Sequence, residues 1–302
     1  MILSASAAPV EIEVQAPTSA ATGSDLDLAI GCRAADDVEV TGIDAALVAR
    51  MTYAARQIGM PGAASVFRGR RTEVHSEQHV PGPWPLARGE SVTFPVRLHV
   101  PETGFGTARS ELVAIEWSAR VRLGAKGHTY AEASQVIDVR SDAGDRAFVA
   151  MSLPRTDDRG VAALSFGRLS TRVLSPGRAL SGTVTITPLR LAVARAARVV
   201  VVLRQQVHHT EWEAVDRSRH PDFVENERET LLSAAQLGEE LELSPGRPLS
   251  LAFRLPAKPA LPAPSIQAPP FRLNWILRAE LDRGLRRRPF VEVELHGRTA
   301  PG

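Results

Sequence analysis

The stretch from Leu243 to Leu281 reads LSPGRPLSLAFRLPAKPALPAPSIQAPPFRLNWILRAEL, and it decides the fold class. Apolar residues alternate with more polar ones at both ends of it. One apolar series is Leu249, Leu251, Phe253 and Leu255, and the other is Phe271, Leu273, Trp275, Leu277, Ala279 and Leu281. A period of two gives each segment one buried and one wetter face. The stretch therefore predicts two β-strands joined by a proline-rich loop.

The same pattern occurs earlier in the chain, in GESVTFPVRLHVP from position 89 and LVAIEWSARVRL from position 112. Trp117 and Trp275 both begin a W-x-x-R-x-x-L motif, in which Arg120 matches Arg278, and the two motifs are 158 positions apart. Two glycine and arginine pairs repeat at an offset of 157, namely Gly89 with Gly246 and Arg97 with Arg254. These offsets predict two copies of one domain.

These motifs resemble those of the arrestin-like superfamily, which includes arrestins, arrestin-like retromer subunits and bacterial sporulation-control (SpoOM-like) proteins. The resemblance covers residues 243–295 most clearly, with L-x-x-G, a strand that ends in L-P, a proline-rich loop and W-x-x-R-A-E-L-D. It implies an all-β chain of two tandem immunoglobulin-like (arrestin-like) β-sandwich domains that bind other proteins without catalysis. No motif matches the phosphate sensor of visual arrestins.

The length of 302 residues suits two domains of about 150 residues each. Residues 140–160 carry charges, glycine and proline, as interdomain connections do. We therefore expect an N-terminal domain at 1–142, a linker at 143–160 and a C-terminal domain at 161–302. An irregular crossover with one helical turn at Ala54–Ile58 is expected within residues 50–72, and its counterpart is a loop from Glu213 to Glu229.

The composition excludes several classes of protein. The apolar share is 44%, the charged share is 23% and the formal net charge is +2, which are ordinary values for a globular protein. Arginine outnumbers lysine without a basic surplus, so no specific nucleic-acid partner is expected. The single cysteine, Cys32, excludes an intramolecular disulfide and a cysteine-based zinc site. With no signal peptide or membrane-spanning segment in the sequence, we expect a cytoplasmic protein.

No catalytic motif is recognised, because G-x-S-x-G, H-E-x-x-H and the phosphate-binding G-x-x-x-x-G-K are all missing from the sequence. His75 and His79 would lie about 13 Å apart on a strand, too far to share a metal ion. The same distance separates Glu73 from Glu77, which argues against a general acid–base pair. The histidines, including His208, His209 and His220, are interpreted as solvated, and we expect no enzyme activity, metal or cofactor.

Two arginine clusters are candidate sites for an anionic partner. They comprise Arg68, Arg70 and Arg71, and Arg283, Arg286, Arg287 and Arg288, the latter at an expected hairpin tip. Guanidinium groups bind phosphate and carboxylate oxygens in a bidentate manner, although solvated turns also collect arginine. Trp117, Trp275, Arg120 and Arg278 are interpreted as structural residues, the tryptophans because they occupy the apolar positions of their strands.

The sequence thus favours a non-catalytic adaptor or scaffold for protein partners that it does not identify. Edge strands of an open sandwich offer a way to bind them, because an extended segment can add to such an edge. The alternative is a binder of anionic ligands or of a membrane surface through the arginine-rich tips. The oligomeric state stays open.

Overall fold

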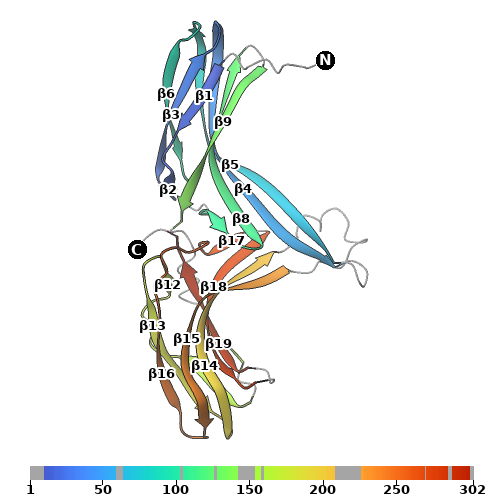
Figure 1. Cartoon of the computed structure of the whole chain (residues 1–302), viewed down its shortest axis with the longest axis vertical. Helices are drawn as coiled ribbons and strands as arrows, with labels where there is room; N and C mark the ends of the chain where they lie inside the picture. Colours follow the sequence, from blue (N-terminus) through green and yellow to red (C-terminus); the bar gives the residue numbers. More distant parts are fainter. Residues whose placement is uncertain are drawn as a thin grey trace. The chain divides into compact units, whose positions relative to one another are not determined.

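The computed structural model describes residues 10–58, 64–102, 105–125, 128–141, 154–157, 160–207, 226–268, 270–284 and 288–299. Every regular element in these ranges is a β-strand and none is a helix (Figure 1). The all-β prediction is confirmed. The described residues accordingly offer no helix of the length and apolarity that crossing a membrane requires.

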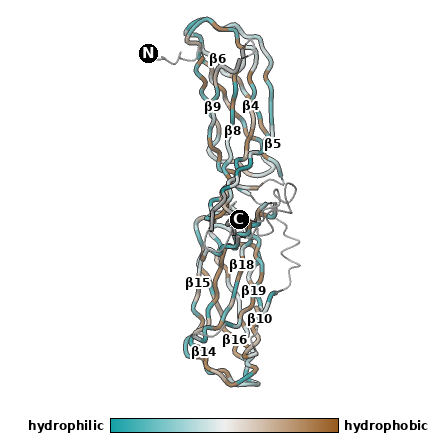
Figure 2. Tube along the Cα trace, turned by 90° about the vertical axis from the view of Figure 1, so that its right-hand side faces the viewer, coloured by the Kyte–Doolittle hydropathy of each residue, from teal (hydrophilic) through white to brown (hydrophobic). Residues whose placement is uncertain are grey.

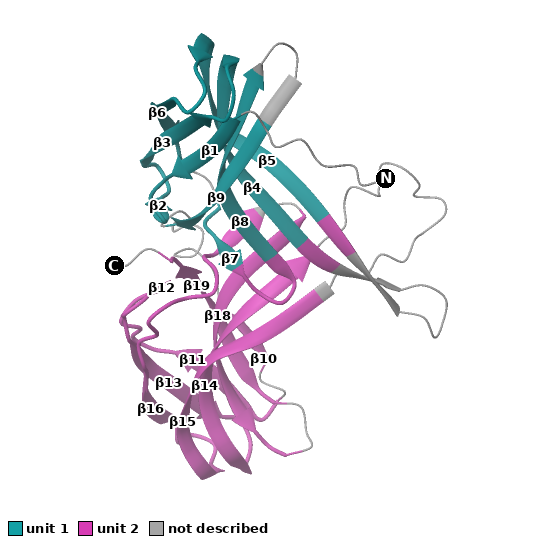
Figure 3. Cartoon of the chain, turned by 45° about the horizontal axis from the view of Figure 1, so that its top comes forward, with its two compact units in different colours: residues 1–52, 70–108, 114–143 teal, residues 53–69, 109–113, 144–302 magenta. Residues whose placement is uncertain are grey.

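The chain divides into two compact units (Figure 3). Unit 1 consists of Met1–Thr52, Arg70–Ala108 and Ala114–Ala143, and unit 2 consists of Tyr53–Gly69, Arg109–Val113 and Gly144–Gly302. Each unit is therefore built from segments that are discontinuous in the sequence. Within the expected linker at 143–160, the described residues Arg155–Asp157 form strand β10.

Unit 1 contains a small antiparallel sheet and most of a large sheet. The small sheet has the order β1 (Val10–Gln15), β3 (Asp25–Ala34) and β6 (Ser91–His99). The large sheet has the order β2 (Ser19–Ala21), β9 (His128–Arg140), β8 (Val113–Ala125), β4 (Val38–Ile58) and β5 (Ala64–Leu86), and β7 (Ala108–Arg109) also pairs with β8. The C-terminal end of β4, from Tyr53, and the N-terminal end of β5, up to Gly69, belong to unit 2.

Unit 2 has the same plan. Its small sheet has the order β11 (Ala162–Phe166), β13 (Leu180–Pro188) and β16 (Leu249–Leu255). Its large sheet has the order β10, β19 (Phe290–Gly297), β18 (Phe271–Asp282), β14 (Ala192–Val207) and β15 (Asn226–Leu243). Two short strands complete it, since β12 (Val173–Leu174) pairs with β19 and β17 (Ile266–Ala268) pairs with β18.

The two tryptophans of the repeated motif are anchored in the same way. Trp117 and Trp275 are both fully buried. The indole N–H of Trp117 donates to the Phe105 carbonyl at 3.0 Å, and that of Trp275 donates to the Ala263 carbonyl at 3.0 Å, in each case 12 residues back along the chain. Each hydrogen bond fixes the loop that leads into its own strand, so the two units share a structural device as well as a motif.

A second repeated device ties that loop to the neighbouring strand. In unit 1 the Thr107 N–H donates to the Val139 carbonyl, while the Val139 N–H donates to the Thr107 hydroxyl. Ser265 and Gly297 exchange the corresponding two bonds in unit 2. A β-carbon at Gly297 would overlap the Trp275 indole, which explains the glycine there. The offset of 158 residues seen in the sequence is thus matched bond for bond.

Apolar and polar residues alternate along the strands (Figure 2). The buried apolar side chains form the core between the small and the large sheet of each unit. The segment Val199–Leu203 departs from alternation, and all five of its side chains are buried. It lies in β14, between β15 and β18, and Val200 and Val202 form a second apolar cluster with Ile276 on the sheet's other face. A central strand covered on both faces has this composition.

The irregular crossover expected at residues 50–72 and its helical turn are wrong for the described residues 50–58 and 64–72, which are strand, while residues 59–63 lie outside the described ranges. Strand β4 continues through this region to Ile58, because Met51 and Tyr53 keep the buried parity of the strand. Cross-strand packing therefore outweighs the helix preference of the alanines that follow. The expected loop at Glu213–Glu229 is shorter at its far end, since β15 begins at Asn226. Residues 213–225 lie outside the described ranges.

We predict that replacing Trp275 with alanine lowers the free energy of unfolding of unit 2 by about 3–5 kcal/mol, because a large cavity opens and the Ala263 carbonyl loses its donor. That is a large share of the roughly 5–15 kcal/mol that holds a domain folded. Chemical denaturation followed by tryptophan fluorescence and circular dichroism measures the change. Trp275→Phe is the control, since it keeps most of the volume. An unchanged unfolding curve for Trp275→Ala would contradict the burial of this side chain.

Candidate functional site

The open edge of the small sheet in unit 2 is the first candidate site. The N–H groups of Gly167 and Ser170 donate to the carbonyls of Thr183 and Ser181, so these alternate residues of β13 point away from β16. Backbone groups of alternate residues point to opposite sides of a strand. The remaining residues of β13, including Gly182, therefore hold β16.

The register between β13 and β16 then shows which backbone groups of β16 face β13 and which face away from it. Gly182 pairs with Phe253, and the neighbouring pairs on this parity join Leu180 to Leu255 and Val184 to Leu251. The intervening residues Ser250, Ala252 and Arg254 thus direct their N–H and carbonyl groups away from β13. All three are exposed, and within the described part of the chain no partner strand or side chain bonds these backbone groups. The edge is open over seven residues with a single charge.

The equivalent strand of unit 1, β6, has a closed edge. Its Arg97 N–H donates to the Gln78 side chain at 3.0 Å, and its His99 N–H donates to the Ser76 hydroxyl at 3.1 Å. Pro95, on the same parity, has no N–H to offer. At the offset of 157 residues the position of this proline is taken by alanine in β16. One repeat has therefore blocked the edge that the other leaves free.

The long edges of the two large sheets carry features that oppose pairing with another chain. Strand β15 has two register shifts against β14, a positive φ of 46° at Glu240, and several glutamates. Strand β5 contains three prolines, Pro81, Pro83 and Pro85. Bulges, charges and prolines are the usual means by which edge strands avoid aggregation. Strands β10 and β11 are edges too, but they span only three and five residues.

The first arginine cluster lies on β5. Arg68 and Arg70 are exposed, whereas Arg71 is 2.7 Å from Glu73. The three residues do not form a cluster of free cations, because Glu73 neutralises one of them.

The second arginine cluster spans the connection between β18 and β19, which are antiparallel neighbours. Arg288 is 3.4 Å from Glu280 and 3.6 Å from Asp282. The Nε of Arg283 is buried and makes no hydrogen bond to the described residues. Arg286 and Arg287 lie outside the described residues. Of the two arginines of this cluster that the structure describes, Arg288 is paired with carboxylates and Arg283 has a buried Nε.

A network of four charged side chains on the outer face of the large sheet in unit 2 was not predicted from the sequence. Arg204 of β14 is 2.7 Å from Glu229 and 2.9 Å from Glu292, and Arg278 of β18 is 2.6 Å from each of the same two carboxylates. The Glu292 side chain is only 6% exposed. Each carboxylate therefore bridges two guanidinium groups drawn from different strands.

Burial and pairing act in opposite directions on this carboxylate–guanidinium network. Burial penalises the charged form of Glu229, but hydrogen bonds from Arg278 and Arg204 outweigh it and hold the pKa of Glu229 below its ordinary value. Burial likewise penalises the charge of Arg204, and its bonds to Glu292 and Glu229 raise its pKa nonetheless. Pairing thus favours the charged forms of Glu229, Arg204 and Arg278, and the network lies on the same face of the sheet as the apolar cluster of Val200, Val202 and Ile276. At the matching position of unit 1, Arg120 makes a looser pair with Glu132 at 3.3 Å.

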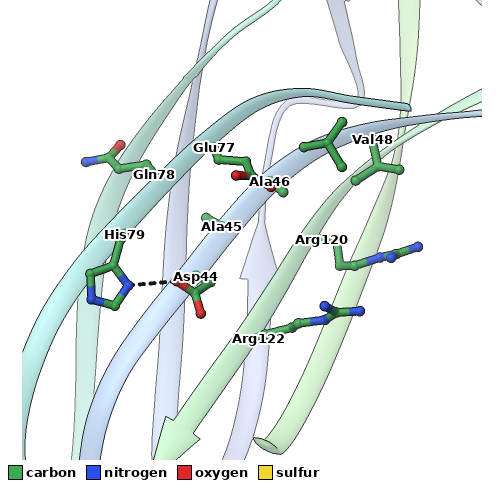
Figure 4. Close-up of a pocket in the computed structure, with 10 residues that line it drawn as sticks. Asp44, Ala45, Ala46, Val48, Glu77, Gln78, His79, Arg120 and Arg122 are labelled. Atoms are coloured by element: carbon green, nitrogen blue, oxygen red, sulfur yellow. Dashed lines mark hydrogen bonds and ion pairs between the residues drawn. The ribbon is translucent and has the colours of Figure 1, made fainter. Parts of the chain in front are cut away.

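A shallow pocket of about 450 Å³ lies on unit 1, on the face formed by β4, β5 and β8 (Figure 4). Asp44 and His79 are hydrogen-bonded in it, with 2.7 Å between Oδ1 and Nδ1, and both side chains are more than half exposed. The lining contains no hydroxyl or thiol nucleophile, and the Arg120 and Arg122 guanidinium groups that border it share Glu132.

The interpretation of His75 as a solvated side chain is wrong. Its ring packs on Trp117 with 4.7 Å between ring centroids, and its side chain is 17% exposed. Burial lowers the pKa of His75, and the nearby Glu73 opposes that shift only in part. His208, His209 and His220 lie outside the described residues. Among the residues that are described, no three or more His, Cys, Asp or Glu side chains are grouped so that they could hold a metal ion.

Comparison of the chain with protein-family models and with curated proteins finds no match.

We predict that Glu292→Gln destabilises unit 2 by about 3–5 kcal/mol, because Arg204 and Arg278 lose a buried counter-charge. The control is Glu116→Gln, which breaks the pair between Arg50 and Glu116, whose side chains are 44% and 50% exposed. That change should cost about 1 kcal/mol or less. Urea denaturation of both variants provides the comparison. Equal effects of the two substitutions would contradict a buried role for the network.

Acid should also weaken unit 2 through Glu229. Because the pKa of Glu229 is lowered by folding, its contribution is complete above the ordinary value of 4.5 and is lost as the pH falls through the lower folded value. The unfolding free energy of Glu229→Gln should therefore fall less steeply than that of the wild type between pH 5 and pH 3, as denaturation curves at each pH would measure. Parallel pH profiles would rule out this linkage.

Proposed function

We propose that the protein is a non-catalytic, cytoplasmic adaptor or scaffold that binds extended segments of partner proteins by β-strand addition. The repeated pairs of sheets support two tandem immunoglobulin-like sandwich domains of the arrestin-like kind, in agreement with the resemblance of residues 243–295 to that superfamily. A chain of this class works by presenting surfaces, and no cofactor is required.

The observation that carries the proposal is the open edge of β16. Ser250, Ala252 and Arg254 present backbone donors and acceptors to solvent on a strand without proline or bulge. An added strand gains main-chain hydrogen bonds from these groups, while its alternate side chains contact the surface beside the strand and supply specificity. The neighbouring outward side chains of β13 are Ser181, Thr183 and Thr185, so the surface beside the edge is polar, uncharged and built from small residues.

The competing proposal, binding of an anionic ligand or membrane surface through the arginine tips, has less support. Arg71 and Arg288 already have carboxylate partners within their own units. Such a site would have to break or share these pairs. Arginine in this position is better suited to accelerating the association of an acidic partner than to holding it.

The experiment is an affinity capture from the native cell, repeated with two variants. Ala252→Pro removes an outward N–H from β16 and should abolish capture of the bound partner. Arg286, Arg287 and Arg288 changed together to glutamate should slow association and reduce its salt dependence, while most of the short-range affinity remains. Pro95→Ala is the control, because Arg97 and His99 stay capped on the closed edge of β6.

The opposite outcome would overturn the proposal. If the triple arginine change abolishes capture and Ala252→Pro leaves it intact, strand addition at β16 is wrong and the anionic-ligand function takes its place. Binding to vesicles of anionic lipid that disappears at high salt would identify the membrane surface as the ligand.

A further inference from the structure

The strand β16 is complementary to itself when two copies run antiparallel. Its sequence is LSLAFRL, with Ala252 at the centre. Reading outward from the centre, Leu251 meets Phe253 of the second copy, Ser250 meets Arg254, and Leu249 meets Leu255. Apolar residues thus meet apolar residues, polar meet polar, and no like charges are opposed. Directly opposed pairs of this kind stabilise a sheet, whereas opposed like charges weaken it.

The backbone is arranged for the same pairing. The outward groups of β16 belong to Ser250, Ala252 and Arg254, so a two-fold axis at Ala252 places three hydrogen-bonding pairs across the junction. Each such pair exchanges two bonds, which gives about six in total. The central side chain is a methyl group on the exposed face, which lets the two strands approach without a clash.

The side chains beside the axis do not oppose the approach. On the exposed face of the small sheet, Arg254 lies opposite Ser181, Ala252 opposite Thr183, and Ser250 opposite Thr185. The two Arg254 guanidinium groups would be four residues apart along the strands, about 13 Å. Unit 1 offers no such junction, because its equivalent strand has Pro95 at the centre and its next two outward donors are capped.

We propose that β16 pairs with β16 of a second copy of this chain, which joins two small sheets into one continuous six-stranded sheet around a two-fold axis. The proposal rests on the proposed function, in that both require β16 to accept a strand, and it names the second copy as that strand's source. A seven-residue junction is small, so the association is weak and depends on concentration.

Sedimentation equilibrium of the full chain over a range of concentrations measures the association. The wild type should approach the mass of two chains, and Ala252→Pro should weaken the association at least tenfold. Ser250→Arg places arginine opposite Arg254 twice and should weaken it about fivefold or more. The exchange Ser250→Arg with Arg254→Ser restores the serine–arginine pairs, so it should recover the association. Circular dichroism verifies that each variant is folded.

A cysteine pair reports the register. Opposed residues in a hydrogen-bonded pair lie about 5.5 Å apart between α-carbons, within the 4.4–6.8 Å that a disulfide spans. Ala252→Cys should therefore form a cross-linked dimer on mild oxidation, whereas Ser250→Cys should not, because its two copies lie about 14 Å apart. The native thiol does not interfere, since Cys32 is buried and burial raises its pKa to about 11.

A wild-type chain that sediments as one copy at all concentrations overturns self-pairing, as does a dimer indifferent to Ala252→Pro and Ser250→Arg. If in that case Ala252→Pro still abolishes capture of a different protein, the proposed function stands and only its partner changes. If Ala252→Pro leaves both self-association and capture unchanged, both the self-pairing of β16 and the proposed strand addition are wrong.

Discussion

Both units depend on the need of a buried indole for a hydrogen-bond acceptor. A tryptophan N–H in an apolar core costs free energy unless a carbonyl meets it. In each unit that carbonyl comes from the loop that precedes the tryptophan's own strand, and the same loop is bonded by a hydroxyl and a backbone pair to the next strand of the sheet. Strand, loop and neighbouring strand are thereby fixed together, and the small sheet packs on the surface that they form.

The parts of this architecture that follow from local pattern could be predicted from the sequence. The alternation around Trp117 and Trp275 indicates their burial, and the run Val199–Leu203 indicates a strand covered on both faces. The repeat was detectable because Gly89 and Gly246 both adopt a positive φ at a turn, and Arg120 and Arg278 both pair with a glutamate. Where two patterns competed, as after Met51, the local preference of the alanines misled, because the deciding contacts are made across strands.

The candidate sites depend on residues that are distant in sequence, and no local signal joins them. Glu292 meets Arg204 only because β18 pairs with both β14 and β19, and the cap that Gln78 gives to Arg97 depends on how β5 passes β6. The contrast between Pro95 and Ala252 is visible in the aligned repeats. The sequence does not show that this contrast opens an edge, because only the register of β13 with β16 shows which backbone groups face outward.

Because the two units share one sheet plan, each strand could pair during folding with the wrong copy of its partner strand. The sizes of the opposed core side chains discriminate between the correct and the incorrect partner. In unit 1 Leu28 lies opposite Val96, while at the corresponding place in unit 2 Gly182 lies opposite Phe253. Exchange of β6 and β16 would set valine against glycine, leaving a void, and leucine against phenylalanine, crowding the other core. The larger side chain of the opposed pair lies on β3 in unit 1 and on β16 in unit 2. Strand exchange, a characteristic misfolding route of repeated domains, is thus penalised in both directions.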